Sequence, residues 1–383
     1  MDWACSATSW RCAGWRPTWR PVADARPRRL AALSDAITAA QLDALLVTGL
    51  ANIRYLTGFS GSSALVVVTP RDTLLITDFR YQTRVADEVG ALARVVIEPV
   101  SLWNGLWEHL GAMGGVKVVG FESPHMVHRD FQRLLEAGGR WQWRPTSELV
   151  EHLRERKDEE EVACIQRAVD VAGRALARTL PAVRAGMTEL AVAGLLEHAL
   201  RDEGSEGFAF PSIVAAGARS ALPHAQPTGH RVAVGDLLLF DFGASVDGYV
   251  SDVTRTVVVG RASAEQREVY EVVREANRSA SAAVHAGMTG RDADAVARSY
   301  IERHGLGELF GHSLGHGIGL EVHEAPRLAR TAEQVLPPGA VVTIEPGVYR
   351  PGWGGVRIED DVWLGAQGPR VLTDIPRELL ELV

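Results

Sequence analysis

The 383-residue chain has few cysteines, no excess of positive charge and no long apolar run, and each absence excludes a class of protein. Three cysteines are too few for a disulfide framework, which fits a reducing cytoplasm. A formal net charge of -8 argues against general nucleic-acid binding, because phosphate contacts need clustered Lys and Arg. No stretch has the length and apolar purity of a membrane-spanning helix. We therefore expect a soluble cytoplasmic protein with no nucleic-acid and no membrane partner.

The N-terminal end lacks the periodicity of a folded segment. Trp3, Trp10, Trp15 and Trp19 alternate with Arg and Pro, and no continuous apolar core for a secretory signal is present. We expect residues 1–27 to be a disordered extension, or a stretch added by a start codon placed too early. A docking tail is the alternative.

From residue 28 onward, helical and strand patterns alternate. Strands are predicted at residues 43–49, 63–70, 72–78, 93–100 and 117–123, and helices at 29–41, 79–89, 102–113 and 127–136. Residues 51–59 are expected to form a turn that enters a further element. Such alternation indicates a compact α/β domain over residues 28–150. The charged stretch 152–161 is then either a linker or the solvated start of the next helix.

The second half contains an internal repeat. Residues 183–200 (VRAGMTELAVAGLLEHAL) are echoed by residues 284–301 (VHAGMTGRDADAVARSYI), and each copy lies between two helical patterns. Thr188 and Thr289 are placed to cap the second helix of each copy. Duplication of this kind predicts a domain over residues 151–383 with pseudo-twofold symmetry.

Two pairs of acidic residues lie in strand–turn–strand patterns. FDFGASVDGYVSD predicts a hairpin around residues 246–248, so Asp241 and Asp252 fall roughly opposite each other. Two like charges repel there unless a cation lies between them. The alternative is that either Asp caps a turn or pairs with Arg255. Glu345 and Glu359 flank the turn PGWGG and can also meet across a hairpin.

The two hairpins together predict four carboxylates around one point, which two divalent cations would balance. GHSLGHGIGLEVHE adds His312, His316 and His323, of which one is enough to complete a five-ligand site. The others could donate hydrogen bonds to a substrate or intermediate. The glycines indicate close backbone packing, and the helical HExxH zinc motif is absent. His224 in ALPHAQP is either a surface loop residue or a further functional one. The pattern predicts metal-assisted hydrolysis.

These motifs resemble those of the M24 or pita-bread metallopeptidases, specifically their Xaa-Pro peptidase branch. The resemblance runs from about residue 28 to the C-terminus and rests on NIRYLTGFSGSSA, TDFRY, ALPHAQP, DFGASVDGYVSDVTRT, GHGIGLEVHE, TIEPGVY and GGVRIEDD. It implies an α/β creatinase-like N-terminal domain followed by an α+β pita-bread catalytic domain with pseudo-twofold symmetry. A homodimer is also expected from the resemblance.

The resemblance implies a dinuclear metal site. By position, Asp252 and Glu359 would bridge both metal ions. Asp241 would bind one ion, and His316 and Glu345 would bind the other. Two manganese ions are expected, with cobalt or zinc as alternatives, because ligand type does not settle the metal.

It also implies roles in the reaction for the groups around the metals. Glu345 would be the general base for a water, and His224 and His323 would stabilise the tetrahedral intermediate or hold the substrate. His312 would line the proline side of the pocket, and Arg357 would orient the site through the carboxylates.

The expected substrates are proline-containing dipeptides or short peptides. Prolidases cut Xaa-Pro dipeptides and aminopeptidases P cut longer peptides; we favour the dipeptidase. A dipeptidase needs a cation for the C-terminal carboxylate or a wall against a third residue. We hypothesise that Arg54, in ANIRYLTGF, reaches over the cleft for this purpose; a salt bridge within its own domain is the alternative. A creatinase-like or binding protein on the same fold is a remote alternative, since it would lack the ligands.

Overall fold

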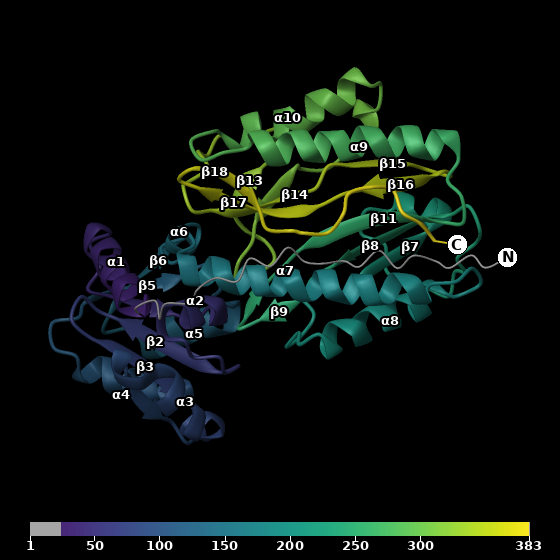
Figure 1. Cartoon of the computed structure of the whole chain (residues 1–383). Coiled ribbons are helices and arrows are strands. Elements are labelled where there is room, and N and C mark those ends of the chain that lie inside the picture. The colour runs from purple at the N-terminus through teal and green to yellow at the C-terminus, as the bar shows by residue number, and fades with distance from the viewer. Residues whose placement is uncertain (1–23, 383) are drawn as a thin grey trace.

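The structure, a computed structural model, describes residues 24–382. Most of the extension predicted for residues 1–27 lies outside the described residues, which begin at residue 24. Arg26 and Pro27 belong to the first helix, so the predicted boundary at residue 27 is too late. An N-terminal unit, purple to blue in Figure 1, lies beside a larger unit that runs from teal to yellow. None of the helices within residues 24–382 is long and apolar enough to cross a bilayer.

The N-terminal unit is a six-stranded sheet with strand order β4-β3-β2-β1-β5-β6 and helices on both faces. Its strands are β1 (Ala44–Val47), β2 (Ala64–Val68), β3 (Thr73–Thr77), β4 (Arg94–Ile97), β5 (Val118–Glu122) and β6 (Gln142–Thr146). Its helices are α1 (Arg26–Ala39), α2 (Leu50–Thr57), α3 (Gln82–Val89), α4 (Leu102–Ala112) and α5 (His128–Ala137).

Alternate residues of β1 belong to two apolar cores, one on each face of the sheet. Leu45 and Val47 pack with residues of α1, α2 and α3. Ala44 and Leu46 pack with residues of α4 and α5. A strand covered on both faces is apolar throughout, which explains why this segment shows no alternation of apolar and polar residues.

The predicted α/β alternation is confirmed, with two differences. Residues 50–57 form the helix α2, where a turn was expected. Strand β6 was not predicted, because its segment is short and contains Pro145. Proline is tolerated there because β6 is an edge strand of the sheet.

The charged stretch 152–161 joins the two units. It holds the short helix α6 (Glu151–Arg154) and the start of α7 (Glu159–Thr179). Asp158 and Glu161 form a capping box at that start. Both also bind Arg29 of α1, at 2.8 and 3.1 Å. The stretch is therefore both the connection and the capped beginning of a helix.

The second unit has two helix pairs with strands between them (Figure 1). One half contains α7, α8 (Glu189–Asp202), β7 (Ile213–Ala216), β8 (Leu237–Phe242) and β11 (Val253–Val259). The other contains α9 (Ala264–Ala283), α10 (Gly290–Arg303), β12 (Gly315–Gly317), β13 (Glu324–Leu328), β14 (Val341–Ile344), β17 (Asp360–Gly365) and β18 (Gly368–Val371). The remaining strands are β9 (Ser245–Val246), β10 (Tyr249–Val250), β15 (Gly347–Arg350), β16 (Gly354–Arg357) and β19 (Glu381–Leu382). Short 3₁₀ helices span Phe79–Tyr81, Gly90–Leu92, Leu180–Ala182, Gly217–Ala221 and Gly307–Leu309.

The internal repeat predicted from AGMT has a structural counterpart in both halves. The hydroxyl of Thr188 accepts a hydrogen bond from the Ala191 amide at 3.1 Å, capping α8. The hydroxyl of Thr289 accepts one from the Asp292 amide at 3.1 Å, capping α10. Each threonine also forms an isolated β-bridge within its own half. The pseudo-twofold pita-bread arrangement follows from this duplication.

The two caps should contribute equally to stability. We expect Thr188→Ala and Thr289→Ala each to lower the free energy of unfolding by about 1 kcal/mol, since each leaves a helix amide without its acceptor. Urea denaturation followed by circular dichroism measures the change. Thr→Ser at either position keeps the hydroxyl and should restore most of it. A loss at only one position would show that the two halves are not equivalent at their caps.

Candidate active site

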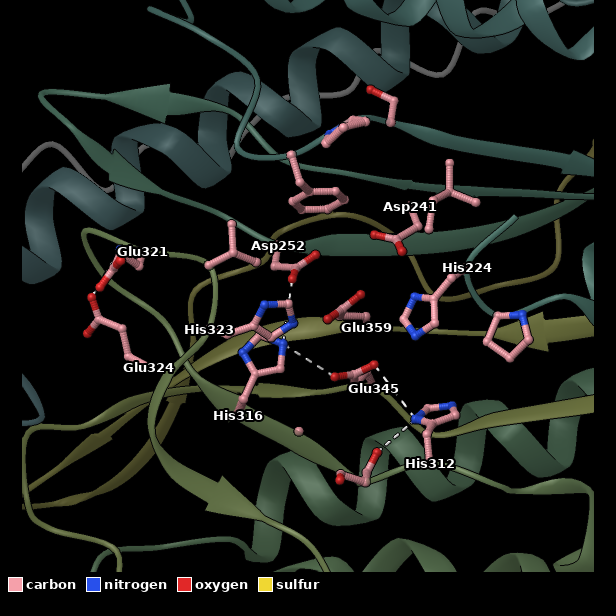
Figure 2. A pocket seen from close by; sticks show the side chains of 18 of the residues that line it. His224, Asp241, Asp252, His312, His316, Glu321, His323, Glu324, Glu345 and Glu359 are labelled. Carbon is pink, nitrogen blue, oxygen red and sulfur yellow. Dashed lines mark hydrogen bonds and ion pairs between the residues drawn. The ribbon is translucent and has the colours of Figure 1, made fainter. Parts of the chain in front are cut away.

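A cavity of about 1280 Å³ opens between the two halves of the second unit and the segment around α6. All the predicted site residues except Arg54 line it. Figure 2 shows acidic and imidazole side chains from both halves pointing into one space. The site is thus built where the duplicated halves meet.

The first acidic pair comes from β8 and the hairpin before β11. Asp241 is registered opposite Thr254, so Asp252 lies two residues away from direct opposition. An offset of two keeps both side chains on the same face of the hairpin. The turn is formed by Asp247 and Gly248, both with positive φ, as a two-residue hairpin requires.

Arg255, the alternative partner of these aspartates, contacts neither of them. Its guanidinium donates to Asp360 at 2.7 Å instead. The period of two along β11 places Arg255 on the opposite face from Thr254. The alternative of an Asp–Arg255 ion pair is wrong.

The second acidic pair lies directly across a hairpin, as its spacing predicts. Ile344 pairs with Asp360 on one side of the pair, and Gly347 pairs with Arg357 on the other. These two ladders share one register, so Glu345 and Glu359 are opposite each other between them. The Glu345 amide donates to Leu314 at 2.8 Å and the Glu359 amide to Thr254 at 3.1 Å, which fixes both backbones.

The segment with three histidines packs closely against its neighbours. His316 is in β12, which pairs with β13 through a bulge after His316. A side chain at Gly315 would collide with the Thr343 carbonyl, and one at Gly317 with the Ala325 carbonyl. The prediction of close backbone packing is confirmed. It explains why glycine flanks His316 on both sides.

The imidazole of His316 is held as a neutral group with one nitrogen facing the acids. Its Nδ1 donates to the Gly317 carbonyl at 3.0 Å, so Nε2 carries the lone pair. This Nε2 lies 3.5 Å from Glu345 Oε1 and 3.7 Å from Asp252 Oδ2. Burial lowers the pKa of His316 to about 4. Metal ions require this neutral form of histidine.

The four carboxylates destabilise one another in the absence of a cation. Burial and the nearby Glu359 raise the pKa of Asp252 well above its ordinary value, and that of Glu345 likewise. Burial raises the pKa of Glu359 to about 8 and also raises that of Asp241. Ionised together, these groups need added positive charge.

The same residues offer free ligand atoms. Asp252, His316 and Glu359 present atoms that all lie within 4.8 Å of one another. The Oδ1 atoms of Asp241 and Asp252 are buried and have no hydrogen-bond partner within the described part of the chain. Buried polar atoms of this kind require a partner, and a divalent cation is one that suits carboxylate oxygens. The donor set fits metal ions.

Arg357 is the one buried arginine or lysine that forms an ion pair with a carboxylate of this cluster within residues 24–382. It forms an ion pair with Asp241 and donates to Thr254 Oγ1 at 2.9 Å and Tyr349 Oη at 2.7 Å. Thr254 in turn donates to Glu359 Oε2 at 2.6 Å. Arg357 therefore fixes Asp241 directly and Glu359 through one hydroxyl.

Sequence reasoning missed Thr254 and Tyr349. The Tyr349 hydroxyl lies 3.0 Å from His312 Nε2 as well as near Arg357, so it joins the histidine to the acidic cluster. Both residues stand inside the quoted motifs VSDVTRT and TIEPGVY. Only the folded hairpins reveal that their hydroxyls point to the charged groups.

The three other histidines surround the same space from different sides (Figure 2). His312 packs against Tyr349, and burial lowers its pKa to about 4. The ring of His323 lies 4.3 Å from that of His316, at a tilt of 54°, and burial lowers the pKa of His323. His224 faces them from the loop that follows residues 217–221. All four histidines predicted for the site are brought together.

Arg54 is the predicted site residue that the fold places elsewhere. It lies on α2, and its guanidinium packs against the turn at Gly248, where an added side chain would collide with it. Neither Arg54 nor Gly248 lines the cavity. Within one chain, Arg54 contacts the catalytic unit but not the site.

A second acidic and histidine cluster lies between the units, formed by Glu122, His125 and Glu151. The Asn52 amide donates to Glu122 and Glu151, both at 2.6 Å. Arg154 donates to the Asn52 side chain at 2.6 Å. The carboxylates are thus already satisfied by hydrogen bonds, and the cluster holds the two units together.

Arg154 and Lys157 extend this network to the loop that carries His323. Arg154 donates to Glu321 at 2.8 Å and Glu324 at 2.5 Å, on either side of the histidine. Lys157 donates to Glu324 at 3.0 Å. The linker between the units thereby fixes one wall of the cavity.

Comparison with known proteins gives a consistent result. The model of "Metallopeptidase family M24" matches residues 163–366, and that of "Creatinase/Prolidase N-terminal domain" matches residues 29–156. An Xaa-Pro dipeptidase of Pyrococcus horikoshii is 36% identical over 341 residues, covering 88% of this chain and 95% of that protein. An uncharacterized peptidase of Bacillus subtilis is 40% identical, covering 89% and 96%.

Solved structures named for two substrate classes have the same sequence identity to this chain. An Xaa-Pro dipeptidase from Bacillus anthracis has a TM-score of 0.90 at 38% identity and covers 93% of this chain and 100% of its own. An X-Pro aminopeptidase from Thermotoga maritima has a TM-score of 0.85 at 38% identity and covers 93% and 99%. Overall similarity therefore does not separate cleavage of dipeptides from cleavage of longer peptides.

The raised carboxylate pKa values predict how metal binding depends on pH. His312 and His316 have a pKa of about 4 in the folded state and 6.5 in the unfolded state, so they finish titrating near the start of the window from pH 6.5 to 8. Each changes the free energy of unfolding there by only about 0.4 kcal/mol. Glu359 has a pKa of about 8 when folded and 4.5 when unfolded, so the folded state binds the extra proton. Metal-free protein should therefore lose stability across this window, by roughly 1.6 kcal/mol from Glu359 alone.

A divalent cation takes the place of that proton, so adding Mn²⁺ should raise the melting temperature more at pH 8 than at pH 6.5. Thermal unfolding with chelator and with Mn²⁺ at both pH values measures this. Glu359→Gln, which cannot ionise, should reduce the difference. An equal rise at both pH values would mean that metal binding does not displace protons from these acids.

Proposed function

This chain belongs to metallopeptidase family M24, and we propose that it is a dinuclear-metal exopeptidase that hydrolyses the bond between an N-terminal residue and proline, acting on Xaa-Pro dipeptides. The observation that carries the proposal is the convergence of four buried carboxylates and a neutral imidazole in one cavity. Relatives named Xaa-Pro dipeptidase match nearly the whole chain.

Five side chains would hold the two metal ions. They are Asp241, Asp252, His316, Glu345 and Glu359, which offer about seven to nine carboxylate and imidazole ligand atoms in all. Manganese is the proposed metal, with cobalt or zinc as alternatives, because oxygen-rich sites with one nitrogen suit several divalent ions. When bound, the ions supply Lewis-acid polarisation of the scissile carbonyl and lower the pKa of water.

The surrounding residues would perform the proton transfers and stabilise charge. Glu345 would accept the proton of the attacking water, since its Oε1 lies beside Thr343 and His316 at the cavity wall. His323 and His224 face the space from opposite sides and would donate hydrogen bonds to the developing oxyanion. His312, held by Tyr349, would line the proline side.

Arg357 would keep the acidic cluster in its working geometry. It compensates one of the four negative charges by pairing with Asp241. Its hydrogen bond to Thr254 orients the Thr254 hydroxyl, which donates a hydrogen bond to Glu359. Its role is to position the carboxylates rather than to contact the substrate.

We further propose a cytoplasmic homodimer. The dimer follows from the family resemblance, and sedimentation velocity measures it. The cytoplasmic location is supported by the low cysteine content. Burial raises the pKa of the free Cys164 thiol to about 11, which makes it an unreactive core residue.

Arg327 is our candidate for recognising the C-terminal carboxylate of a dipeptide. Three arginines of the described residues line the cavity, and Arg154 and Arg357 are engaged in ion pairs. Arg327 is exposed and forms no ion pair with any residue in the range 24–382. It is registered opposite His316, next to the proposed metal site. Arg54 remains the hypothesis from sequence, but it lies outside the cavity lining.

The activity should depend on the metal and on its ligands. Chelated protein should release no proline from an Ala-Pro dipeptide, and Mn²⁺ should restore release. Asp252→Asn should lower kcat/KM at least about 100-fold, the scale at which loss of one preorganised electrostatic group acts. Asp247→Asn, in the exposed turn of the same hairpin, should leave activity unchanged. Hydrolysis that persists in chelator would refute a dinuclear mechanism.

Substrate length should depend on Arg327. We expect Arg327→Ala to raise KM for Ala-Pro at least tenfold, because a charge-assisted hydrogen bond to the carboxylate is lost. KM for Ala-Pro-Ala should change less, since its carboxylate lies one residue further away. Arg54→Ala, tested in parallel, should leave the ratio of the two rates unchanged. If Arg54→Ala changes this ratio and Arg327→Ala does not, the carboxylate is recognised by Arg54. Arg54 would then reach the site of another copy of the chain.

A further inference from the structure

The carboxylate of Glu189, the first residue of α8, is completely buried and plays no part in the metal site. Its Oε1 accepts hydrogen bonds from the Ala216 amide at 2.9 Å and from Arg219 Nε at 3.0 Å. Its Oε2 accepts from the Thr228 amide at 2.9 Å and from the Thr228 hydroxyl at 2.8 Å. A buried charge with this many donors is stabilised, and its removal leaves several of them unpaired.

These donors lie at both ends of one loop, residues 217–228, which carries His224. Ala216 ends β7 just before the loop, and Thr228 is the last residue of the loop. Arg219, bound to Glu189, also donates to the Gln226 carbonyl at 2.8 Å, across the loop. The Glu189 carboxylate therefore binds both ends of the loop directly, and it contacts the middle of the loop through Arg219.

The His224 imidazole depends on this support. No hydrogen bond to its ring is formed by any residue of the described chain, so its position follows from the loop backbone. Figure 2 shows the ring directed into the space between Asp241 and His312. The neighbouring Pro223 carbonyl accepts from Arg357 at 3.2 Å, which ties the loop to the acidic cluster on its inner side. Glu189 supplies the matching tie on the outer side.

The duplicated half shows that the helix itself does not require this acid. The residue after the capping threonine is Glu189 in the first half and Gly290 in the second. A side chain at Gly290 would collide with the Arg327 carbonyl, because the neighbouring backbone packs directly on the helix start there. An acid at this position is thus specific to the half that carries the His224 loop.

We propose that Glu189 is a positioning residue that sets the place of His224 in the cavity. The inference rests on the proposed function, in which His224 donates to the developing oxyanion. Both carboxylate oxygens are needed as acceptors. In a glutamine, whichever way the amide is turned, its NH₂ group faces the amide of either Ala216 or Thr228, and one end of the loop is released.

Glu189→Gln should lower kcat about tenfold and change KM less than about twofold, because small displacements of a reacting group cost rate rather than binding. Glu189→Asp keeps both oxygens and should recover part of the loss. Thr188→Ala is the matched control: it weakens the same helix end and lowers the melting temperature, but it should leave kcat unchanged. A Glu189→Gln enzyme with unaltered kcat would overturn the proposal.

A double-mutant cycle tests whether the effect passes through His224. In the His224→Ala background, Glu189→Gln should change kcat less than twofold, since the group it positions is already absent. Losses that multiply would show that Glu189 acts through another residue, and would overturn the assignment. The cycle uses kcat at saturating Ala-Pro with Mn²⁺.

Hydrogen–deuterium exchange separates this inference from the proposed activity. In the Mn²⁺-loaded protein, exchange of residues 217–228 should be faster in Glu189→Gln than in the wild type or Thr188→Ala. If no peptide is hydrolysed, the proposed function fails. The exchange rate of residues 217–228 still shows whether Glu189 fixes the loop that carries His224. Should Glu189→Gln not fold, Arg219→Leu removes the contact across the loop from a partly exposed position and should show the same faster exchange. Unchanged exchange in the variant that folds would overturn the proposal.

Discussion

The structure depends on a concentration of negative charge that the protein alone cannot compensate. Asp241, Asp252, Glu345 and Glu359 are buried together, and burial raises the pKa of each. Repulsion from neighbouring carboxylates raises the pKa of Asp252, Glu345 and Glu359 further. Arg357 offsets one charge. The other three carboxylates would be either protonated or in need of cations, and bound metal ions would supply the missing positive charge. The remaining features of the second unit can be understood as means of maintaining this arrangement.

Rigid hairpins and duplicated halves hold the four carboxylates close together. Each half contributes one acidic pair on a β-hairpin, where backbone register, not side-chain flexibility, fixes the distance between like charges. The helix pairs α7–α8 and α9–α10 cover the outer faces of these strands with separate apolar cores. Burial on this scale stabilises each half enough to tolerate the repulsion at their junction. The charged site is thus placed where two stable halves meet.

The same logic explains how much the sequence alone could predict. Hairpin pairing has a period of two and a constant register, so residue numbers sufficed to bring Glu345 opposite Glu359 and Asp241 near Asp252. The diagonal offset of the aspartates was not predictable, because it depends on which two residues form the turn. The hypothesis that Arg54 reaches over the cleft stays untested: within one chain Arg54 lies against Gly248, outside the cavity lining. The reach of a side chain from one unit to another depends on packing that no local pattern encodes. Thr254, Tyr349 and Glu189 were missed for a related reason: their importance lies in partners that only the fold brings close, such as Glu359 for Thr254 and His312 for Tyr349.

Substrate length must then be decided outside the metal cluster. The cavity, at about 1280 Å³, exceeds the roughly 300–1,000 Å³ typical of sites for small organic ligands, so its walls within one chain do not exclude a third residue by volume. Selection for dipeptides therefore requires one of two features. Either a positive charge binds the C-terminal carboxylate of the dipeptide, or another copy of the chain supplies a wall that excludes a third residue. The loop around His323 is fixed by Arg154 and Lys157 from the linker, which also joins the N-terminal unit through Asn52. The N-terminal unit can thus influence specificity by shaping this wall, even where none of its side chains reaches the substrate.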